Sequence, residues 1–372
     1  NAYNVAVGHS AGLSVTTGVQ NTIIGALAGD ALTDADVNTA VGYFALGTDT
    51  LGSRSTAFGY AALALQNFTT ATDTFNTAVG YSAGAAVTTG TLNTLIGGLA
   101  GDAITTATDS TFVGYLAGSA TTDGNHNTGI GSNALAANTG GQNTAVGRDA
   151  LAANTSASFN TAVGRSALSA NTEGNRNVAV GKDAMRANTL GSRNVAVGES
   201  ALDALNLTTA TDSYNIGVGY FAGGSMTTGL NNTLIGGLAG DAITASNDNV
   251  AVGTAALTTN TLSSENVAIG RSALQELNHT TATDGFNVAV GSDAGKLVTT
   301  GTNNTLIGGL AGDALTDADL NVAVGDNALS ADTLGSRSTA IGRSALSSQN
   351  FTTATDTYNT AVGFNAGTAI TT

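Results

Sequence analysis

The segment Asn38–Leu46, which reads NTAVGYFAL, is one copy of the pattern that decides the fold of this chain. Aligned on Asn/Ser-x-x-x-Gly-x-x-Ala, the pattern occurs 21 times in the chain. The usual interval between copies is 17, as from Asn21 to Asn38, with one interval of 16 and four of 21. Gly fills the fifth place and Ala the eighth place of every copy. Repetition at a short fixed period is typical of solenoids, in which each repeat forms one coil. We therefore predict an all-β parallel β-solenoid of about 21 coils, forming a single continuous domain over residues 1–372.

The first five residues of a copy predict a short strand that ends at a corner. The second residue is mostly Thr or Val and the fourth is Val, Ile or Phe. These two share one face of a strand, because side chains alternate with a period of two. We expect this face to fill the coil interior and the third residue, mostly Ala, to face outward. The invariant Gly suits a corner with positive φ, and the Ala-Leu after it indicates a second strand. The repeated Asn is expected to form a hydrogen-bonded ladder between copies.

A longer, four-coil period combines three ordinary copies with one long copy. The last three long copies begin at Asn194, Asn266 and Ser338, at a constant interval of 72. Each long copy contains Thr-Thr-Ala-Thr-Asp and ends on an aromatic residue: Phe75, Tyr214, Phe286 and Tyr358. We expect four bulges in line on one edge, with the aromatic ring packing the longer loop against the solenoid. Bulky residues at the third place mostly follow the same rhythm and are expected to project as pegs: Ile23, Leu95, Leu234 and Leu306.

The composition limits the classes of function. The chain has 11 basic and 26 acidic residues, a formal net charge of −15, and neither Cys nor Pro. A nucleic-acid partner is disfavoured, because such proteins carry a basic footprint. Without Cys the chain forms no disulfide and offers no thiolate to a metal. No apolar run reaches about 18 residues, so we expect no membrane insertion.

Residues suited to catalysis do not converge in the pattern. His9, His126 and His279 occupy three different places within their copies, and the chain lacks a catalytic triad, an HExxH motif and a P-loop. We expect no enzymatic activity and no cofactor. The alternative is calcium bound at turn carboxylates, namely Asp30, Asp102, Asp241 and Asp313, with the pairs Asp34/Asp36 and Asp317/Asp319. The repeat lacks the Gly-Gly-x-Gly-x-Asp pattern of calcium β-rolls, so solvated turn carboxylates are the favoured interpretation.

Two rows of surface residues are the candidate binding residues. The place after the invariant Gly varies, which indicates that it faces solvent. It holds Tyr43, Tyr60 and Tyr81 in three successive copies, and later Arg148, Arg165 and Lys182 in three more. A stacked Tyr row could form a platform for sugar rings, and a basic row could bind an acidic glycan. Solvent-facing decoration of a spacer is the alternative for both rows.

The motif Asn-Thr-Ala-Val-Gly-x-x-Ala-Leu resembles the head repeats of trimeric autotransporter adhesins (YadA-like heads), and equally the repeats of phage tail fibres. The resemblance covers the whole chain. It implies a left-handed parallel β-roll in a homotrimeric fibre, located at the cell surface or in a virion tail fibre. It also leads us to expect that the chain is a segment of a longer fibre protein, with surface glycans or a host receptor as possible partners.

Three functional hypotheses follow. The first is attachment, as an adhesin head or tail-fibre shaft. The second is a purely structural extracellular filament or surface layer that polymerises end to end. The third is an ice- or mineral-binding solenoid, which requires outward Thr and is disfavoured if the second residue points inward. For the trimer we expect the third-residue face, with Ala145 and Ala162, to form the interface, because small residues allow neighbouring sheets to approach closely.

Overall fold

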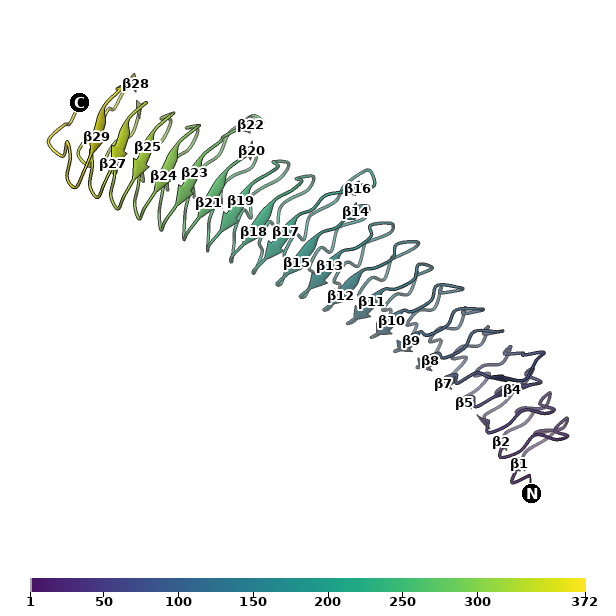
Figure 1. Ribbon diagram of the computed structural model, residues 1–372. Coiled ribbons are helices and arrows are strands. Elements are labelled where there is room, and N and C mark those ends of the chain that lie inside the picture. Colours follow the sequence, from purple (N-terminus) through teal and green to yellow (C-terminus); the bar gives the residue numbers. More distant parts are fainter. Residues whose placement is uncertain (1) are drawn as a thin grey trace. The chain divides into compact units, whose positions relative to one another are not determined.

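The computed structural model describes residues 2–372, which form strands, turns and bends and contain no helix. The chain divides into two compact units, Asn1–Lys182 and Asp183–Thr372. Within each unit, the three-residue strand of one coil pairs in parallel and in register with that of the next (Figure 1). Thr94, for example, lies opposite Thr111, which has the same place in the next copy. The fold is the expected parallel β-solenoid of about 21 coils, and the single continuous domain stays a prediction.

The first unit contains one three-residue strand in each of its coils and one additional pair of two-residue strands. The strands of the main sheet are β1 (Val5–Val7), β2 (Thr22–Ile24), β3 (Thr39–Val41), β5 (Thr56–Phe58), β7 (Thr77–Val79), β8 (Thr94–Ile96), β9 (Thr111–Val113), β10 (Thr128–Ile130), β11 (Thr144–Val146), β12 (Thr161–Val163) and β13 (Val178–Val180). The additional pair is β4 (Gly52–Ser53) with β6 (Thr72–Asp73).

The second unit repeats this arrangement and carries three additional pairs. Its main-sheet strands are β15 (Val195–Val197), β17 (Ile216–Val218), β18 (Thr233–Ile235), β19 (Val250–Val252), β21 (Val267–Ile269), β23 (Val288–Val290), β24 (Thr305–Ile307), β25 (Val322–Val324), β27 (Thr339–Ile341) and β29 (Thr360–Val362). The pairs are β14 (Gly191–Ser192) with β16 (Thr211–Asp212), β20 (Ser263–Ser264) with β22 (Thr283–Asp284), and β26 (Gly335–Ser336) with β28 (Thr355–Asp356).

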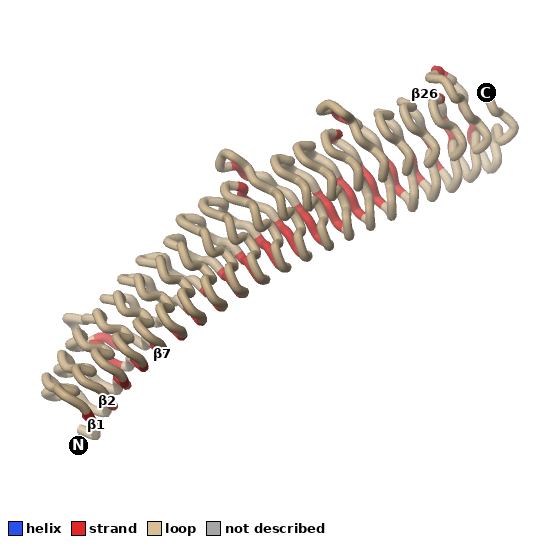
Figure 2. The backbone as a smooth tube through the Cα atoms, turned by 180° about the vertical axis from the view of Figure 1, so that it is seen from behind, coloured by secondary structure: helices blue, strands red, loops and turns tan. Residues whose placement is uncertain are grey.

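The invariant Gly ends each strand at a corner, and in every coil but the last the next coil leaves no space there for a side chain. Gly97 has a φ of +131°, and a Cβ placed on it would lie 2.5 Å from the carbonyl oxygen of Gly114 in the next coil. A side chain would therefore push neighbouring coils apart. The second strand expected at Ala-Leu is absent, and that segment is a run of turns (Figure 2). The reason is local, because residues such as Leu46 adopt positive φ there, at 53°, and cannot continue an extended chain.

The strand faces are the reverse of our expectation. Ala40, Ala145 and Ala162, all at the third place, are completely buried, whereas the second and fourth residues of each copy are partly or largely exposed. The coil is too narrow to hold a Thr and a Val from every strand. Ala instead faces inward, and the Leu, Ile and Met side chains of the turn segment are buried as well. The interface predicted on the Ala face is therefore wrong, because that face lies inside the coil.

The bulky residues at the third place fill the interior and are not surface pegs. Leu95 is completely buried, and the glycines at the ninth place of its own coil and of the preceding coil provide its space. A Cβ on Gly101 would lie 2.8 Å from one Leu95 methyl, and a Cβ on Gly84 would lie 2.6 Å from the other. Interiors are close-packed, so a larger residue at one place requires a smaller one opposite. This explains the alternation of Gly and Leu at the ninth place.

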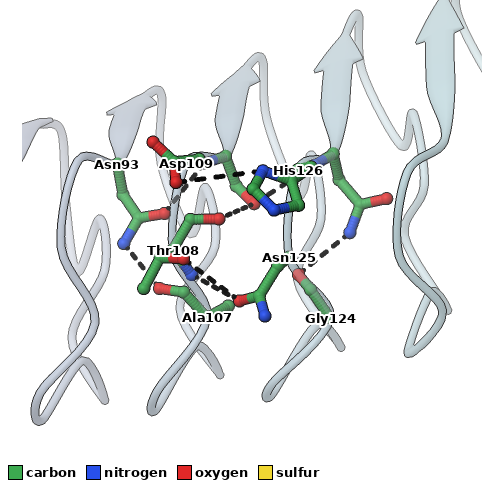
Figure 3. Close-up of polar contacts among 9 residues, drawn as sticks. Asn93, Ala107, Thr108, Asp109, Gly124, Asn125 and His126 are labelled. Atoms are coloured by element: carbon green, nitrogen blue, oxygen red, sulfur yellow. Dashed lines mark hydrogen bonds and ion pairs between the residues drawn. The ribbon is translucent and has the colours of Figure 1, made fainter.

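The repeated Asn is buried in all but the first and last coils and connects successive coils. The side-chain oxygen of Asn93 accepts a hydrogen bond from the backbone N–H of Ser110 at 3.1 Å, and its amide nitrogen donates to the carbonyl of Ala107 at 2.8 Å (Figure 3). The ladder is confirmed, but most of its bonds join a side chain to backbone. Direct amide-to-amide bonds occur mainly in the second unit, as from Asn249 to Asn232 at 3.2 Å. Satisfying buried polar groups in this way fixes the register of the coils.

The longer loops are anchored differently from our expectation. Phe68, near the start of its loop, is 7% exposed, whereas Phe75 at the end is 51% exposed. The aromatic before the next Asn therefore lies outside, and Arg54 of the preceding coil covers its ring at 5.8 Å and pairs with Asp73 at 2.8 Å. In the second unit, the three long loops project on the same side (Figures 1 and 2).

Candidate functional site

The Tyr row lies at the outer corner that follows the main-sheet strand. The invariant Gly turns the chain outward, and the next residue places its side chain on the surface. Backbone hydrogen bonds keep successive coils in register. Ala61 N–H donates to the Tyr43 carbonyl at 2.9 Å, and Ser82 N–H donates to the Tyr60 carbonyl at 2.8 Å. The register of the backbone therefore aligns Tyr43, Tyr60 and Tyr81 in one column.

The three rings of this row stack on one another. The ring centroids of Tyr43 and Tyr60 are 5.4 Å apart with an interplanar angle of 15°, and those of Tyr60 and Tyr81 are 5.3 Å apart at 9°. The rings are 49–60% exposed. Phe44 lies beside Tyr43 at 6.4 Å and adds a fourth ring. The predicted stack is present, and its role in binding stays a prediction.

The remaining aromatic residues of this column do not join the stack. Tyr115 lies two coils beyond Tyr81 and makes no ring contact within residues 2–372. In the second unit, Tyr220 contacts only Phe221, at 6.2 Å, and Phe364 is covered by Arg343 at 5.8 Å. The column thus contains one aromatic stack among the described residues, located in the first unit.

The basic row shares this column. Arg148, Arg165 and Lys182 are exposed on successive coils. Arg148 forms an ion pair with Asp149 at 3.2 Å, so part of its charge is balanced locally. Elsewhere in the column, Arg343 pairs with Asp326 at 3.5 Å and Arg271 pairs with Asp293. Binding of an acidic glycan by the basic row stays a prediction.

Sequence reasoning missed the outward face of the main sheet. The second place holds Thr in nine successive strands of the first unit, from Thr22 in β2 to Thr161 in β12. None of these nine hydroxyls hydrogen-bonds to another group among residues 2–372. The fourth place presents Val, Ile or Phe beside them, with Ile96 38% exposed. The unbroken Thr run was the signal in the sequence, but it was assigned to the wrong face.

The turn carboxylates mostly accept hydrogen bonds from the protein. Asp36 accepts from the backbone N–H of Val19 at 2.8 Å, and Asp319 accepts from that of Thr302 at 2.7 Å. One oxygen of each Gly-Asp-Ala carboxylate is buried without a hydrogen-bond partner, in Asp30, Asp102, Asp241 and Asp313. Burial raises the pKa of Asp102, Asp241 and Asp313, although backbone hydrogen bonds partly oppose the shift. No group of three or more potential metal ligands occurs among residues 2–372.

The three histidines occupy different places of the repeat and have different surroundings. His126 approaches Asp109 of the preceding coil, with Nδ1 3.8 Å from Oδ2, in an exposed pair beside Asn125 and Thr108 (Figure 3). His279 is buried, and its Nε2 lies 2.9 Å from the Thr300 carbonyl. His9 is exposed next to Ser10. Within the described range, no helix is long and apolar enough to cross a bilayer.

Comparison with known proteins does not assign the chain to a family. No protein-family model matches it, and no curated protein is similar enough to count as a relative.

Proposed function

We propose that this chain is a non-enzymatic extracellular fibre segment that attaches to a cell or other surface and associates side by side with copies of itself. The supporting observation is that the solenoid repeats exposed apolar and aromatic side chains in register, coil after coil. Within each unit, such columns offer repeated contacts to an extended partner. The motif's resemblance to adhesin heads and tail fibres favours three copies.

The association surface in this proposal is the outward face of the main sheet. In the second unit its two columns are largely aliphatic, as in Val250 and Val252 of β19 and Val267 and Ile269 of β21. These side chains are partly exposed, and contiguous apolar surface of this kind marks interaction sites. Each coil contributes a modest area, but the sum over many coils reaches the size of obligate interfaces.

Light scattering combined with a glycan array tests the proposal. We expect a mass of three chains at micromolar concentration and binding to at least one surface glycan. Assembly without binding to glycans or cells would favour the purely structural filament. A single chain that binds nothing would contradict the proposal.

A second candidate function, ice or mineral binding, is supported by the nine outward Thr residues. Free hydroxyls and methyl groups repeat about every 4.8 Å along the sheet, the spacing of strands. The hypothesis was disfavoured because the second residue of each copy was expected to point inward, but that residue points outward. Ice recrystallisation assays test it: the native chain should inhibit crystal growth, and T94Y together with T111Y should abolish the inhibition. Growth unaffected by the native chain would eliminate this candidate.

A further inference from the structure

The aromatic column of the first unit contains a gap one residue wide. Tyr81, Gly98 and Tyr115 occupy the same place on three successive coils. The backbone confirms this register, with Leu99 N–H bonded to the Tyr81 carbonyl at 2.9 Å and Leu116 N–H to the Gly98 carbonyl at 3.1 Å. Gly98 therefore stands where the stack would place a ring.

We propose that this gap is a binding slot for a single pyranose ring, with Tyr81 and Tyr115 as its two walls and Gly98 as its floor. The inference rests on the proposed attachment function and names its ligand class.

The size of the gap suits one ring. Two strand spacings place the Cα atoms of Tyr81 and Tyr115 about 10 Å apart. A ring in van der Waals contact with both walls requires about 7–8 Å between them, whereas two stacked rings require about 11 Å. Tyr115 leans towards Gly98, since its Cδ2 lies 3.6 Å from the position of a Cβ on Gly98, which is less than one strand spacing of about 4.8 Å. This lean brings the two walls closer together than their Cα atoms, so the gap is too narrow for two rings and can accept one. Residues 2–372 enclose no pocket, so a ligand in the slot would bind at the surface of the chain.

The chemistry of the slot favours a sugar. Both walls are more than half exposed, at 60% for Tyr81 and 57% for Tyr115, so a ligand can enter without rearrangement of the chain. Tyrosine faces present an apolar surface to the C–H groups of a pyranose, and phenol hydroxyls can hydrogen-bond to its hydroxyls. The chain's net charge of −15 favours a neutral ligand over an anion.

Equivalent glycines in the second unit lack the second wall. Gly237 follows Tyr220, but the next coil has Thr254 in the column, and a Cβ on Gly237 would meet nothing within 4 Å. Gly309 lies between Ser292 and Asp326. Among the glycines of this column in the described residues, Gly98 alone has a Tyr on both sides.

The test fills the slot without disturbing the fold. Gly98 does not have positive φ, so other residues are allowed there. G98Y would complete the Tyr ladder and occupy the gap, whereas G98A adds only a methyl group in ordinary contact with Tyr115. G237Y is the matched control in the second unit. Circular dichroism should show all three variants folded, and Y115A provides an independent removal of one wall.

Saturation-transfer NMR with chitotriose and cellotriose is the readout, with phenol as the aromatic probe. We expect transfer to pyranose C–H protons in the native chain, G98A and G237Y, and at least a tenfold loss in G98Y and Y115A. Unchanged saccharide binding in G98Y would overturn the slot. Binding of phenol but of neither saccharide would overturn the sugar assignment.

The glycan array separates this proposal from the attachment function. Array binding that persists in G98Y would overturn the slot as the attachment site and leave the proposed function intact. A native chain that binds free saccharides through the slot but adheres to no glycan surface or cell would support the slot and contradict the attachment function.

Discussion

The two units have the same kinds of residue in their interiors and differ on their outward faces. In both units the repeated Asn and Ala are buried, and the invariant Gly lies at the corner that ends the strand. Outside, the second place is Thr in nine successive coils of the first unit, whereas the second unit has Val or Ile there in six strands, such as β19 and β21. The Tyr stack also occurs only in the first unit among the described residues. The inner positions therefore determine the fold, and the outer columns are free to specialise. The following experiments test this division, from the largest expected effect to the smallest.

Charging the interior should unfold either unit equally. A162E in the first unit and A289E in the second would bury an unpaired carboxylate where the native Ala is completely buried. We expect a loss of at least about 3 kcal/mol in the free energy of unfolding, seen as loss of the β-type far-UV circular dichroism spectrum. Their neighbours on the outer face, T161E and V288E, are matched controls that should fold. A folded A162E chain whose assembly merely dissociates would restore the Ala face as the interface.

Charges placed on the outward face should affect assembly differently in the two units. V250E with V267E places two carboxylates on the aliphatic columns of the second unit, and T94E with T111E does the same on the Thr column of the first. If assembly depends on apolar burial, the first pair should reduce the mass from light scattering to a single chain at micromolar concentration, and the second should do so only partly. Equal effects would show that both units contribute alike to assembly.

The long loops allow a comparison within the second unit. Arg193 covers Tyr214 at 5.8 Å and pairs with Asp212 at 2.8 Å, whereas the loop that ends at Phe286 has Glu265 at the Arg place. An exposed ion pair and a cation–π contact each contribute about 0.5–1 kcal/mol. R193A should therefore speed proteolytic cleavage of its loop severalfold, and E265R should slow cleavage of the other. No change in either rate would show that these contacts do not order the loops.

The smallest effect should be a shared pH dependence. Burial raises the folded-state pKa of Asp102 and Asp241 above the ordinary value of 3.8. Because the folded state then binds the proton more tightly than the unfolded state, the ionised carboxyls cost stability above the folded pKa. This cost disappears as the pH falls through that pKa towards the ordinary value. D102N and D241N should each raise the melting temperature at pH 7 by less than about 2 °C, and the gain should vanish near pH 4. Calorimetry at both pH values checks this, and an equal gain at pH 4 would assign the effect to another cause.

The sequence predicted the parts of the structure that repetition controls. The regular spacing of the copies predicted the coil, the invariant Gly predicted the corner with positive φ, and the repeated Asn predicted the ladder. Each follows from local geometry applied 21 times. The alignment of Tyr43, Tyr60 and Tyr81 was also predictable, because residues at equal places in a parallel solenoid stack.

The direction of the strand faces was decided only by the tertiary structure. Alternation with period two places Ala78 opposite Thr77 and Val79 but does not say which side is interior. Side-chain volume decides which face is interior. Because the coil is short, its interior has room for one Ala per strand and the Leu or Ile of the turn segment, so Thr and Val lie outside. The gap at Gly98 likewise required three coils to be seen side by side, because its walls, Tyr81 and Tyr115, lie two copies apart in the sequence.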